Sequence, residues 1–263
     1  MLVTGGSSGI GRAAAHAFVA EGARVLIAGR DERRLLETRG SAADPERVVV
    51  HLGDLAESGE AARAVDTAAS RLGRLDVLVN NAGFADETPI LDTTDETWRA
   101  TMAVNLDAVF SAARDAGRYM AERGGGAIVN VSSIDAIAPE APMAAYSVSK
   151  AAVSALTRAF AVELGPLGVR SNAVAPGETH SAMTEADLDD ERFVAGYLPR
   201  IPLGRFALAA EQAAAICFLA SDEASFVNGA VLVVDGGQTA GSWYYPWDGP
   251  ASGGPAGGAP GSA

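Results

Sequence analysis

Short, uninterrupted runs of Val, Ile, Leu and Ala alternate along the chain with longer stretches in which apolar residues recur at helical spacing. Uninterrupted apolar runs are typical of strands that are buried on both faces of a parallel sheet. They predict seven strands, at residues 2–4, 24–28, 48–51, 77–80, 127–131, 171–174 and 231–234. The stretches between them predict helices at residues 12–21, 59–72, 96–123, 144–164 and 211–219.

This alternation of strand and helix indicates an α/β fold made of βαβ units. Because crossovers between parallel strands are right-handed, we expect a doubly wound, mostly parallel seven-stranded sheet of the Rossmann type with helices on both faces. Residues 1–240 are predicted to form a single domain. Residues 241–263 are rich in Gly, Pro, Ser and Ala and are expected to be disordered. Alternatively, the aromatic residues within 243–247 pack on a neighbouring subunit or over the mouth of a binding site.

Charge and composition exclude several classes of function. The formal net charge of −13 repels phosphate backbones and anionic lipids, so neither nucleic acid nor a membrane is an expected partner. The single cysteine, Cys217, excludes an intramolecular disulfide and a cysteine-based metal cluster, and no metal site is predicted. No run approaches the ~20 apolar residues of a membrane span, and the first residues lack a signal-peptide pattern. A cytoplasmic location is therefore expected.

A glycine-rich turn, Thr-Gly-Gly-Ser-Ser-Gly-Ile-Gly at residues 4–11, joins the first predicted strand to a helix. Glycine permits a tight turn and close approach of the backbone to a ligand. The following helix N-terminus offers unpaired N–H groups to an anion. The turn therefore predicts a pyrophosphate site, although its spacing differs from the common G-x-G-x-x-G pattern of dinucleotide-binding folds.

The end of the second predicted strand bears on the choice of cofactor. An acidic residue at this place would bind the adenosine ribose of NAD, whereas this chain has Gly29 followed by Arg30. A guanidinium group can pair bidentately with a 2′-phosphate, so NADP(H) is the preferred cofactor and NAD(H) the alternative. Two other interpretations stay open: Arg30 is solvated while Asp31 caps the next helix, or Asp31 itself binds the ribose.

Further residues at strand ends fit the same edge of the sheet. Asp54 follows the third strand and is predicted either to bind the adenine or to cap the next helix. The small residues of Asn81-Ala82-Gly83 follow the fourth strand and leave room for a cofactor across the carboxyl edge of the sheet.

Tyr146 and Lys150 lie four residues apart on a predicted helix, so both project from one face. Ser133 follows the fifth strand. A phenol near an ammonium group can exchange a proton with a developing alkoxide, and a serine hydroxyl can donate a second hydrogen bond to the same oxygen. Each pattern alone is ordinary, since a Tyr-x-x-x-Lys pair occurs in many amphipathic helices.

Taken together, the turn at residues 4–11, Asn-Asn-Ala-Gly at 80–83, Asn105, Ser133, Tyr146-x-x-x-Lys150 and Pro176-Gly177 occur in the order and spacing of one family. Over residues 1 to about 239 the chain resembles the short-chain dehydrogenases/reductases. The resemblance implies NAD(P)(H)-dependent hydride transfer between a carbonyl compound and an alcohol, in a homotetramer or homodimer built on the helices at 96–123 and 144–164.

The resemblance also implies roles for single residues. Tyr146 would be the acid/base, Lys150 would bind the nicotinamide ribose and lower the pKa of Tyr146, Ser133 would polarise the carbonyl, and Asn105 would hold a relay water. The residues expected to contact the cofactor are Gly5, Ser7, Ser8, Gly9, Ile10, Gly11, Arg30, Asp54, Leu55, Asn81, Ala82, Gly83, Tyr146, Lys150, Pro176, Gly177 and Thr179.

Residues 178–206 are expected to form an acidic substrate lid. Leu167 stands where reductases of acyl-carrier-protein substrates in this family have an arginine, and the acidic lid would repel an acidic partner. We therefore expect a free small-molecule ketone or secondary alcohol. The alternatives are a 3-oxoacyl-thioester reductase and a catalytically silent dinucleotide sensor. The expected edges of the substrate pocket are Phe84, Ile134, Asp135, Ala136, Pro142, Met143 and His180.

Overall fold

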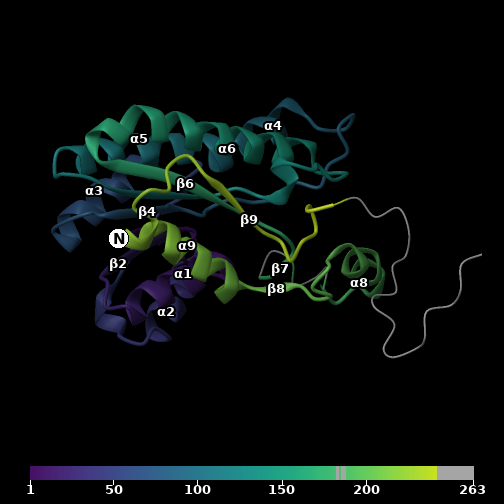
Figure 1. Cartoon of the computed structure of the whole chain (residues 1–263), viewed down its shortest axis with the longest axis horizontal. Helices are drawn as coiled ribbons and strands as arrows, with labels where there is room; N and C mark the ends of the chain where they lie inside the picture. The colour runs from purple at the N-terminus through teal and green to yellow at the C-terminus, as the bar shows by residue number, and fades with distance from the viewer. Residues whose placement is uncertain (182–183, 185–187, 242–263) are drawn as a thin grey trace, which may run out of the picture.

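The computed structural model describes residues 1–181, 184 and 188–241 of the chain (Figure 1). Its centre is a seven-stranded sheet in the order β3-β2-β1-β4-β5-β6-β9, in which every neighbouring pair is parallel. All seven predicted strands are confirmed to within two residues at each end, and so is the doubly wound sheet. The strands are β1 (Leu2–Thr4), β2 (Val25–Gly29), β3 (Val48–Leu52), β4 (Val77–Asn80), β5 (Gly126–Val131), β6 (Val169–Pro176) and β9 (Val231–Val234).

Helices cover both faces of the sheet (Figure 1). One face packs against α1 and α9, and the other against α3, α5 and α6. The helices are α1 (Gly9–Ala20), α2 (Glu32–Gly40), α3 (Glu60–Leu72), α4 (Asp95–Met102), α5 (Ala108–Ala121), α6 (Ala144–Leu164), α8 (Glu191–Tyr197) and α9 (Ala209–Ala220). None of the helices in the described ranges is long and apolar enough to cross a membrane.

Successive side chains of the central strands enter opposite layers of the core. Val3 of β1 packs on the side of α1 and α9, whereas its neighbour Leu2 packs on the side of α3 and α5. In β4, Val79 and Leu78 divide in the same way, and all four side chains are fully buried. Both faces of each strand must therefore be apolar, which explains why the sequence shows uninterrupted runs.

The single helix predicted at residues 96–123 is wrong in one respect. A π-helical turn, Ala103–Asp107, separates α4 from α5 and buries Asn105 completely. A π-turn adds one residue to a helical turn, and it often occurs at functional sites. Apolar spacing alone does not reveal one added residue, so the pattern predicts one continuous helix.

The predicted lid, residues 178–206, includes the short strand β7 (Thr179–His180) and ends just before β8 (Ala207–Leu208), with which β7 pairs in parallel. Ala207 N also donates to Glu178 O at 2.9 Å, so the two ends of the lid segment are held together. Within the lid, Phe193 and Tyr197 of α8 stack with ring centroids 4.2 Å apart. The lid acids Glu185 and Asp187 and the aromatic residues of 243–247 lie outside the described residues.

Candidate active site

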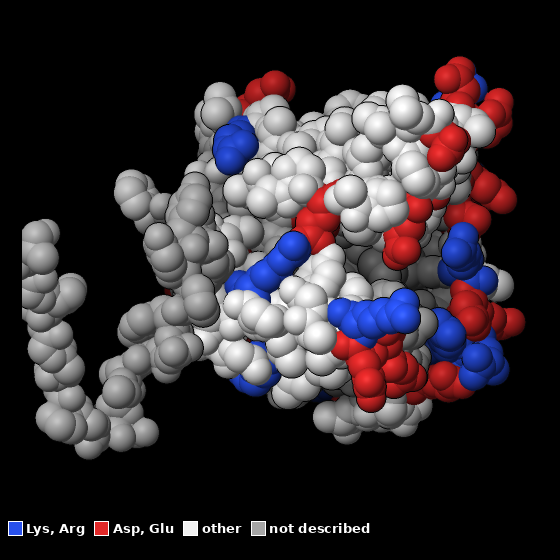
Figure 2. All heavy atoms as spheres, turned by 90° about the vertical axis from the view of Figure 1, so that its right-hand side faces the viewer, with Lys and Arg blue, Asp and Glu red and all other residues white. Residues whose placement is uncertain are grey.

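A cleft of about 820 Å³ opens at the carboxyl ends of the strands. Figure 2 views this side of the molecule, where acidic and basic side chains surround a hollow. Every cofactor-binding residue predicted from the sequence except Gly11 lines the cleft, and Ser133 lines it as well. Gly11 and Asn105 support the lining residues from behind. Ligands of open α/β sheets bind at this edge.

The glycine turn after β1 fits closely against the chain beyond β4. Gly5 has a φ of +66°, and a Cβ there would lie 2.7 Å from Asn81 Nδ2. At Gly11, a Cβ would lie 2.3 Å from Gly5 O and 2.4 Å from Asn81 Nδ2. Asn81 Nδ2 donates to the carbonyls of Thr4 and Gly5, each at 3.1 Å. Side chains in place of these glycines would therefore push the turn away from β4.

The N-terminus of α1 is open to an anion. Its N-cap, Ser8, makes no side-chain capping bond, and the first turn contains no acidic residue. The helix therefore directs unpaired N–H groups and its positive dipole end into the cleft. This is the chemistry that a dinucleotide pyrophosphate requires, so the residues present fit the expected cofactor.

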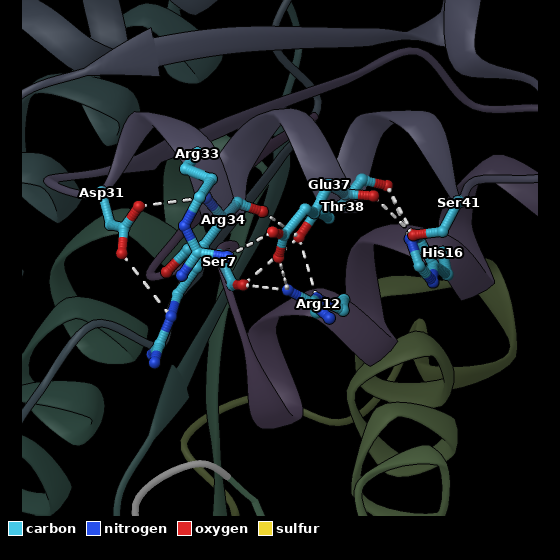
Figure 3. A network of polar contacts seen from close by, with 9 residues as sticks. All are labelled: Ser7, Arg12, His16, Asp31, Arg33, Arg34, Glu37, Thr38 and Ser41. Atoms are coloured by element: carbon cyan, nitrogen blue, oxygen red, sulfur yellow. Dashed lines mark hydrogen bonds and ion pairs between the residues drawn. The ribbon is translucent and has the colours of Figure 1, made fainter.

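A polar network fixes the glycine turn to α2 (Figure 3). Arg12 Nη2 donates to Ser7 O at 2.7 Å, and Arg12 Nε donates to Thr38 Oγ1 at 2.9 Å. Thr38 Oγ1 donates in turn to Arg34 O at 3.0 Å. This network links the turn after β1 to the helix after β2, which also carries Arg34.

The end of β2 offers two guanidinium groups to the cleft. Arg30 is exposed, and no hydrogen bond or ion pair joins its side chain to another residue in the described part of the chain. Asp31 caps α2 by accepting from Arg34 N at 3.0 Å, as one of the two alternatives had it. Arg34 also lines the cleft, with its Nε 3.5 Å from Asp31 Oδ2. Sequence reasoning missed Arg34, which lies one helical turn beyond Arg30.

Asp54 lies in the cleft without capping a helix. Its Oδ1 accepts from Ala56 N at 3.0 Å, which closes a turn after β3. Gly59 is the N-cap of α3, so the capping alternative for Asp54 is wrong. Beyond β6, Thr179 is buried, and its Oγ1 donates to Gly177 O at 2.8 Å.

Ser133, Tyr146 and Lys150 come together where β5 and α6 meet. Lys150 Nζ lies 5.6 Å from the centroid of the Tyr146 ring and donates to Val131 O at 2.9 Å. The Ser133 hydroxyl lies near enough to the Tyr146 phenol to influence the pKa of that phenol. A strand end and the first turn of the next helix thus bring a proton donor, a hydroxyl and an ammonium group to one place.

Burial governs the protonation of this group. Burial raises the pKa of Tyr146 well above its usual range; the nearby Ser133 hydroxyl opposes the rise, and the charges of Asp135 and Glu178 add to it. Burial lowers the pKa of Lys150 to about 8, while Asp135 opposes that change. From the sequence we expect Lys150 to lower the pKa of Tyr146. When only the protein groups are considered, burial outweighs any such lowering. Near neutral pH the phenol holds its proton.

Asn105 joins two parts of the site. Its Nδ2 donates to Phe84 O at 3.0 Å and to Ser149 Oγ at 3.1 Å, while its Oδ1 accepts from Phe84 N at 3.1 Å. A Cβ at Gly83 would lie 3.1 Å from Asn105 Oδ1 and 3.3 Å from Lys150 Nζ. The π-turn therefore fastens the loop after β4 to α6, behind Lys150.

The substrate end of the cleft is acidic. Of the predicted pocket edges, Phe84, Ile134, Asp135, Pro142 and Met143 line the cleft. Ala136 does not, and His180 faces a neighbouring hollow, where its ring meets Phe206 edge-on. Glu140 and Tyr197, which sequence reasoning missed, also line the cleft and form a hydrogen bond with each other across it. No motif marks Glu140, because its partners Tyr197 and Arg200 lie far away in the sequence.

Comparison with known proteins places this fold and site in one family. The family described as Enoyl-(Acyl carrier protein) reductase matches residues 5–239. A galactitol 2-dehydrogenase (L-tagatose-forming) of Cereibacter sphaeroides is 42% identical over 90% of this chain and 93% of its own. A 3-oxoacyl-[acyl-carrier-protein] reductase of Thermotoga maritima is 40% identical over 90% of this chain and 96% of its own.

Solved structures of similar proteins have the same fold as this chain. A putative short-chain alcohol dehydrogenase from Sinorhizobium meliloti 1021 superposes with a TM-score of 0.87 at 37% identity, over 91% of this chain and 95% of its own. A putative NAD(P) dependent gluconate 5-dehydrogenase from Beutenbergia cavernae, with bound NADP at low occupancy, gives a TM-score of 0.84 at 39% identity, over 91% and 96%. The chain belongs to the short-chain dehydrogenase/reductase family.

Proposed function

We propose that this protein is an NADP(H)-preferring oxidoreductase that interconverts a small-molecule ketone and a secondary alcohol. The observation that carries the proposal is the convergence of Ser133, Tyr146 and Lys150 beside a cleft whose far end is built for a dinucleotide. NADP(H), when bound, supplies or accepts the hydride.

The protein side chains handle the proton and the charge on oxygen. In the reducing direction, the protonated Tyr146 phenol donates to the oxygen of the substrate carbonyl, and Ser133 donates a second hydrogen bond that polarises the carbonyl. In the oxidising direction, Tyr146 accepts the hydroxyl proton. Lys150 holds a positive charge near the phenol, which favours the deprotonated form that this direction requires. Asn105 positions the loop after β4 against α6.

The preference for NADP(H) rests on Arg30 and Arg34. Both line the cleft where β2 ends, and the Arg30 side chain is not engaged by any described residue. Asp31, the acidic residue that would otherwise bind a ribose, is engaged as the cap of α2. A 2′-phosphate would supply the anion that these two guanidinium groups require.

Apolar side chains exposed on α5 and α6 support assembly through these helices. Phe110 is 45% exposed, Val148 48% and Val162 77%. A homotetramer or homodimer that packs α5 and α6 together would bury them. Light scattering during size-exclusion chromatography measures the assembly, and a monomer would refute this part of the proposal.

A reductase of acyl-carrier-protein substrates is the second candidate, because the family description and the Thermotoga relative both name such substrates. The surface argues against this candidate, because an acidic carrier protein needs basic side chains at which to dock. Leu167 is 52% exposed on the outside of the molecule, and Arg123 stacks on the Tyr119 ring with its Cζ 3.7 Å from the centroid. An enzyme that reduces a 3-oxoacyl group faster on carrier protein than as a free thioester would favour the second candidate.

Replacing Tyr146 with phenylalanine tests the reaction itself. Removing a general acid costs roughly 10²- to 10⁴-fold in rate, so we expect Tyr146→Phe to lose at least ~100-fold in kcat and to retain cofactor binding. Tyr119→Phe on α5 is the matched control and should keep full activity. Full activity in Tyr146→Phe would refute the mechanism. A wild-type protein that binds the cofactor but oxidises no alcohol and reduces no ketone would instead indicate a dinucleotide sensor.

A further inference from the structure

Asp135 lies beside the Ser133 hydroxyl at the substrate end of the cleft. Ser133 Oγ donates to Asp135 Oδ2 at 2.9 Å and accepts from Asp135 N at 3.1 Å. A serine hydroxyl has one hydrogen to donate. A carboxylate is a stronger acceptor than a neutral carbonyl. Asp135 therefore competes with the substrate oxygen for the hydrogen on which the role of Ser133 depends.

Asp135 can accept a hydrogen bond from a ligand. No described residue donates to its Oδ1, and its side chain is partly open to the cleft. The reacting oxygen of a substrate must lie beside Ser133 and Tyr146. In a gauche vicinal diol, the second oxygen lies about one hydrogen-bond length from the first. Such a hydroxyl is within reach of a carboxylate whose Oδ2 is 2.9 Å from Ser133 Oγ.

The charges around this place favour an uncharged ligand. Glu140 and Glu178 line the same end of the cleft, and Arg200, which does not line the cleft, donates from Nη1 to Glu140 Oε1 at 3.1 Å. Burial raises the pKa of Asp135, the Ser133 hydrogen bond opposes the rise, and the charge of Glu140 adds to it. Among the described residues that line this end, Lys150 is the cation, and it lies beneath the phenol. An anionic substrate would meet repulsion here.

Resting on the proposed function, we propose that Asp135 selects uncharged substrates with a hydroxyl on the carbon next to the reacting carbon, that is, vicinal diols and polyols. The second hydroxyl donates to the free Oδ1 of Asp135, and this bond draws negative charge away from Oδ2. The hold of Oδ2 on the Ser133 hydrogen is thereby weakened, and that hydrogen turns to the reacting oxygen. A simple alcohol lacks this donor and leaves Ser133 bonded to the carboxylate. Asp135 thus determines specificity by binding the substrate and by releasing Ser133.

Cyclopentanol and cis-1,2-cyclopentanediol differ by this one hydroxyl, so their oxidation rates test the proposal. Hydrogen bonds to charged groups change an equilibrium by roughly ten-fold or more, so we expect the diol to have a kcat/KM at least ~10-fold higher. Asp135→Ala should lower the diol value about ten-fold and raise the cyclopentanol value, because Ser133 is then free. Asp135→Asn keeps an acceptor oxygen and should retain part of the preference.

Asp189→Ala is the matched control, because it removes an acid that lines the neighbouring hollow and not the cleft. It should leave the ratio of the two rates unchanged. Equal or slower oxidation of the diol by the wild-type protein would overturn the proposal without any variant. So would a diol preference that survives Asp135→Ala, or faster oxidation of 2-aminocyclopentanol than of the diol, which would make the donor an ammonium group.

The outcomes separate this inference from the proposed function. Oxidation of cyclopentanol without a diol preference would keep the proposed function and refute the role of Asp135. If neither alcohol is oxidised, the proposed function fails, and saturation-transfer NMR on the complex with NADPH then decides the inference. Stronger binding of the diol than of cyclopentanol would support recognition by Asp135, and equal or weaker binding would overturn it.

Discussion

Replacing Arg30 with alanine should weaken the binding of NADPH and leave the binding of NADH unchanged. Arg30 is exposed at the end of β2, lines the cleft, and has no partner among the described residues. A 2′-phosphate would therefore meet a guanidinium group that needs to break no existing bond. NADH has no phosphate at this place, so its affinity should not depend on Arg30.

The size of the effect follows from the exposure of the site. A hydrogen bond to a charged group contributes about 1.5–3 kcal/mol. Solvent screens an exposed pair, so we expect the lower end of that range, which corresponds to a loss of roughly ten-fold in Kd. Arg34→Ala should cost less, a few-fold, because its guanidinium group is shared with Asp31 at 3.5 Å. Higher salt should reduce the effect of both variants.

Fluorescence titration with NADPH and with NADH gives the ratio of the two dissociation constants for each variant. Arg33→Ala is the control, because Arg33 lies on α2 beside Arg34 but pairs with Glu37 at 2.5 Å and lines only the neighbouring hollow. An unchanged ratio in Arg30→Ala would contradict the reasoning. Wild-type protein that binds NADH as tightly as NADPH would do so too, and would move the ribose contact to Asp31 or to backbone groups.

Three further predictions concern stability, reactivity and packing. Burial alone would raise the pKa of Glu60, but hydrogen bonds from His51 at 2.6 Å and from an arginine outweigh it and lower the pKa. The carboxylate therefore stabilises the fold above pH ~4.5 and loses this effect as the pH falls through its lowered pKa. Glu60→Gln should lose about 1–3 kcal/mol in urea denaturation at pH 7 and less at pH 4; an equal loss at both values would refute the role of the charge. Burial raises the pKa of Cys217 to about 11, so at pH 7.5 the native thiol should react with a disulfide reagent much more slowly than the unfolded one, and equal rates would contradict this. Gly83→Ala should lower kcat by roughly ten-fold with little change in KM, because the added methyl group displaces Lys150; an unchanged kcat would show that the site tolerates it.

The sequence predicted the sheet well because its strands obey a local rule. A strand with both faces buried must be apolar at every position, and β1 and β4 are examples whose neighbouring side chains enter different core layers. Their ends at Thr4 and Asn80 then placed the loops that line the cleft. The places of Ser133 and Tyr146 follow from the same pattern of elements, because Ser133 comes just after β5 and Tyr146 lies in the first turn of α6.

Features that depend on tertiary contacts were not predictable. The π-turn at Ala103–Asp107 changes the register of a helix by one residue, which the 3.6-residue periodicity does not resolve. The bond between Tyr197 and Glu140 joins segments 57 residues apart, and nothing local to either residue indicates the other. The hydrogen bond between Ser133 and Asp135 spans two residues, yet only its position in the cleft gives it a consequence for the substrate.

Arg34 was predictable in one respect and not in another, and it allows a stricter test of cofactor recognition. Its place on α2 was open to prediction, but its approach to the cleft depends on the network of Arg12 and Thr38 that ties α2 to the glycine turn. If Arg30 and Arg34 bind one phosphate together, the losses in the double alanine variant should not add, because each guanidinium group holds the phosphate in place for the other. If the losses add, the two residues act independently. If Arg34→Ala weakens the binding of NADPH and of NADH equally, the role of Arg34 is to position α2, and Arg30 alone binds the 2′-phosphate.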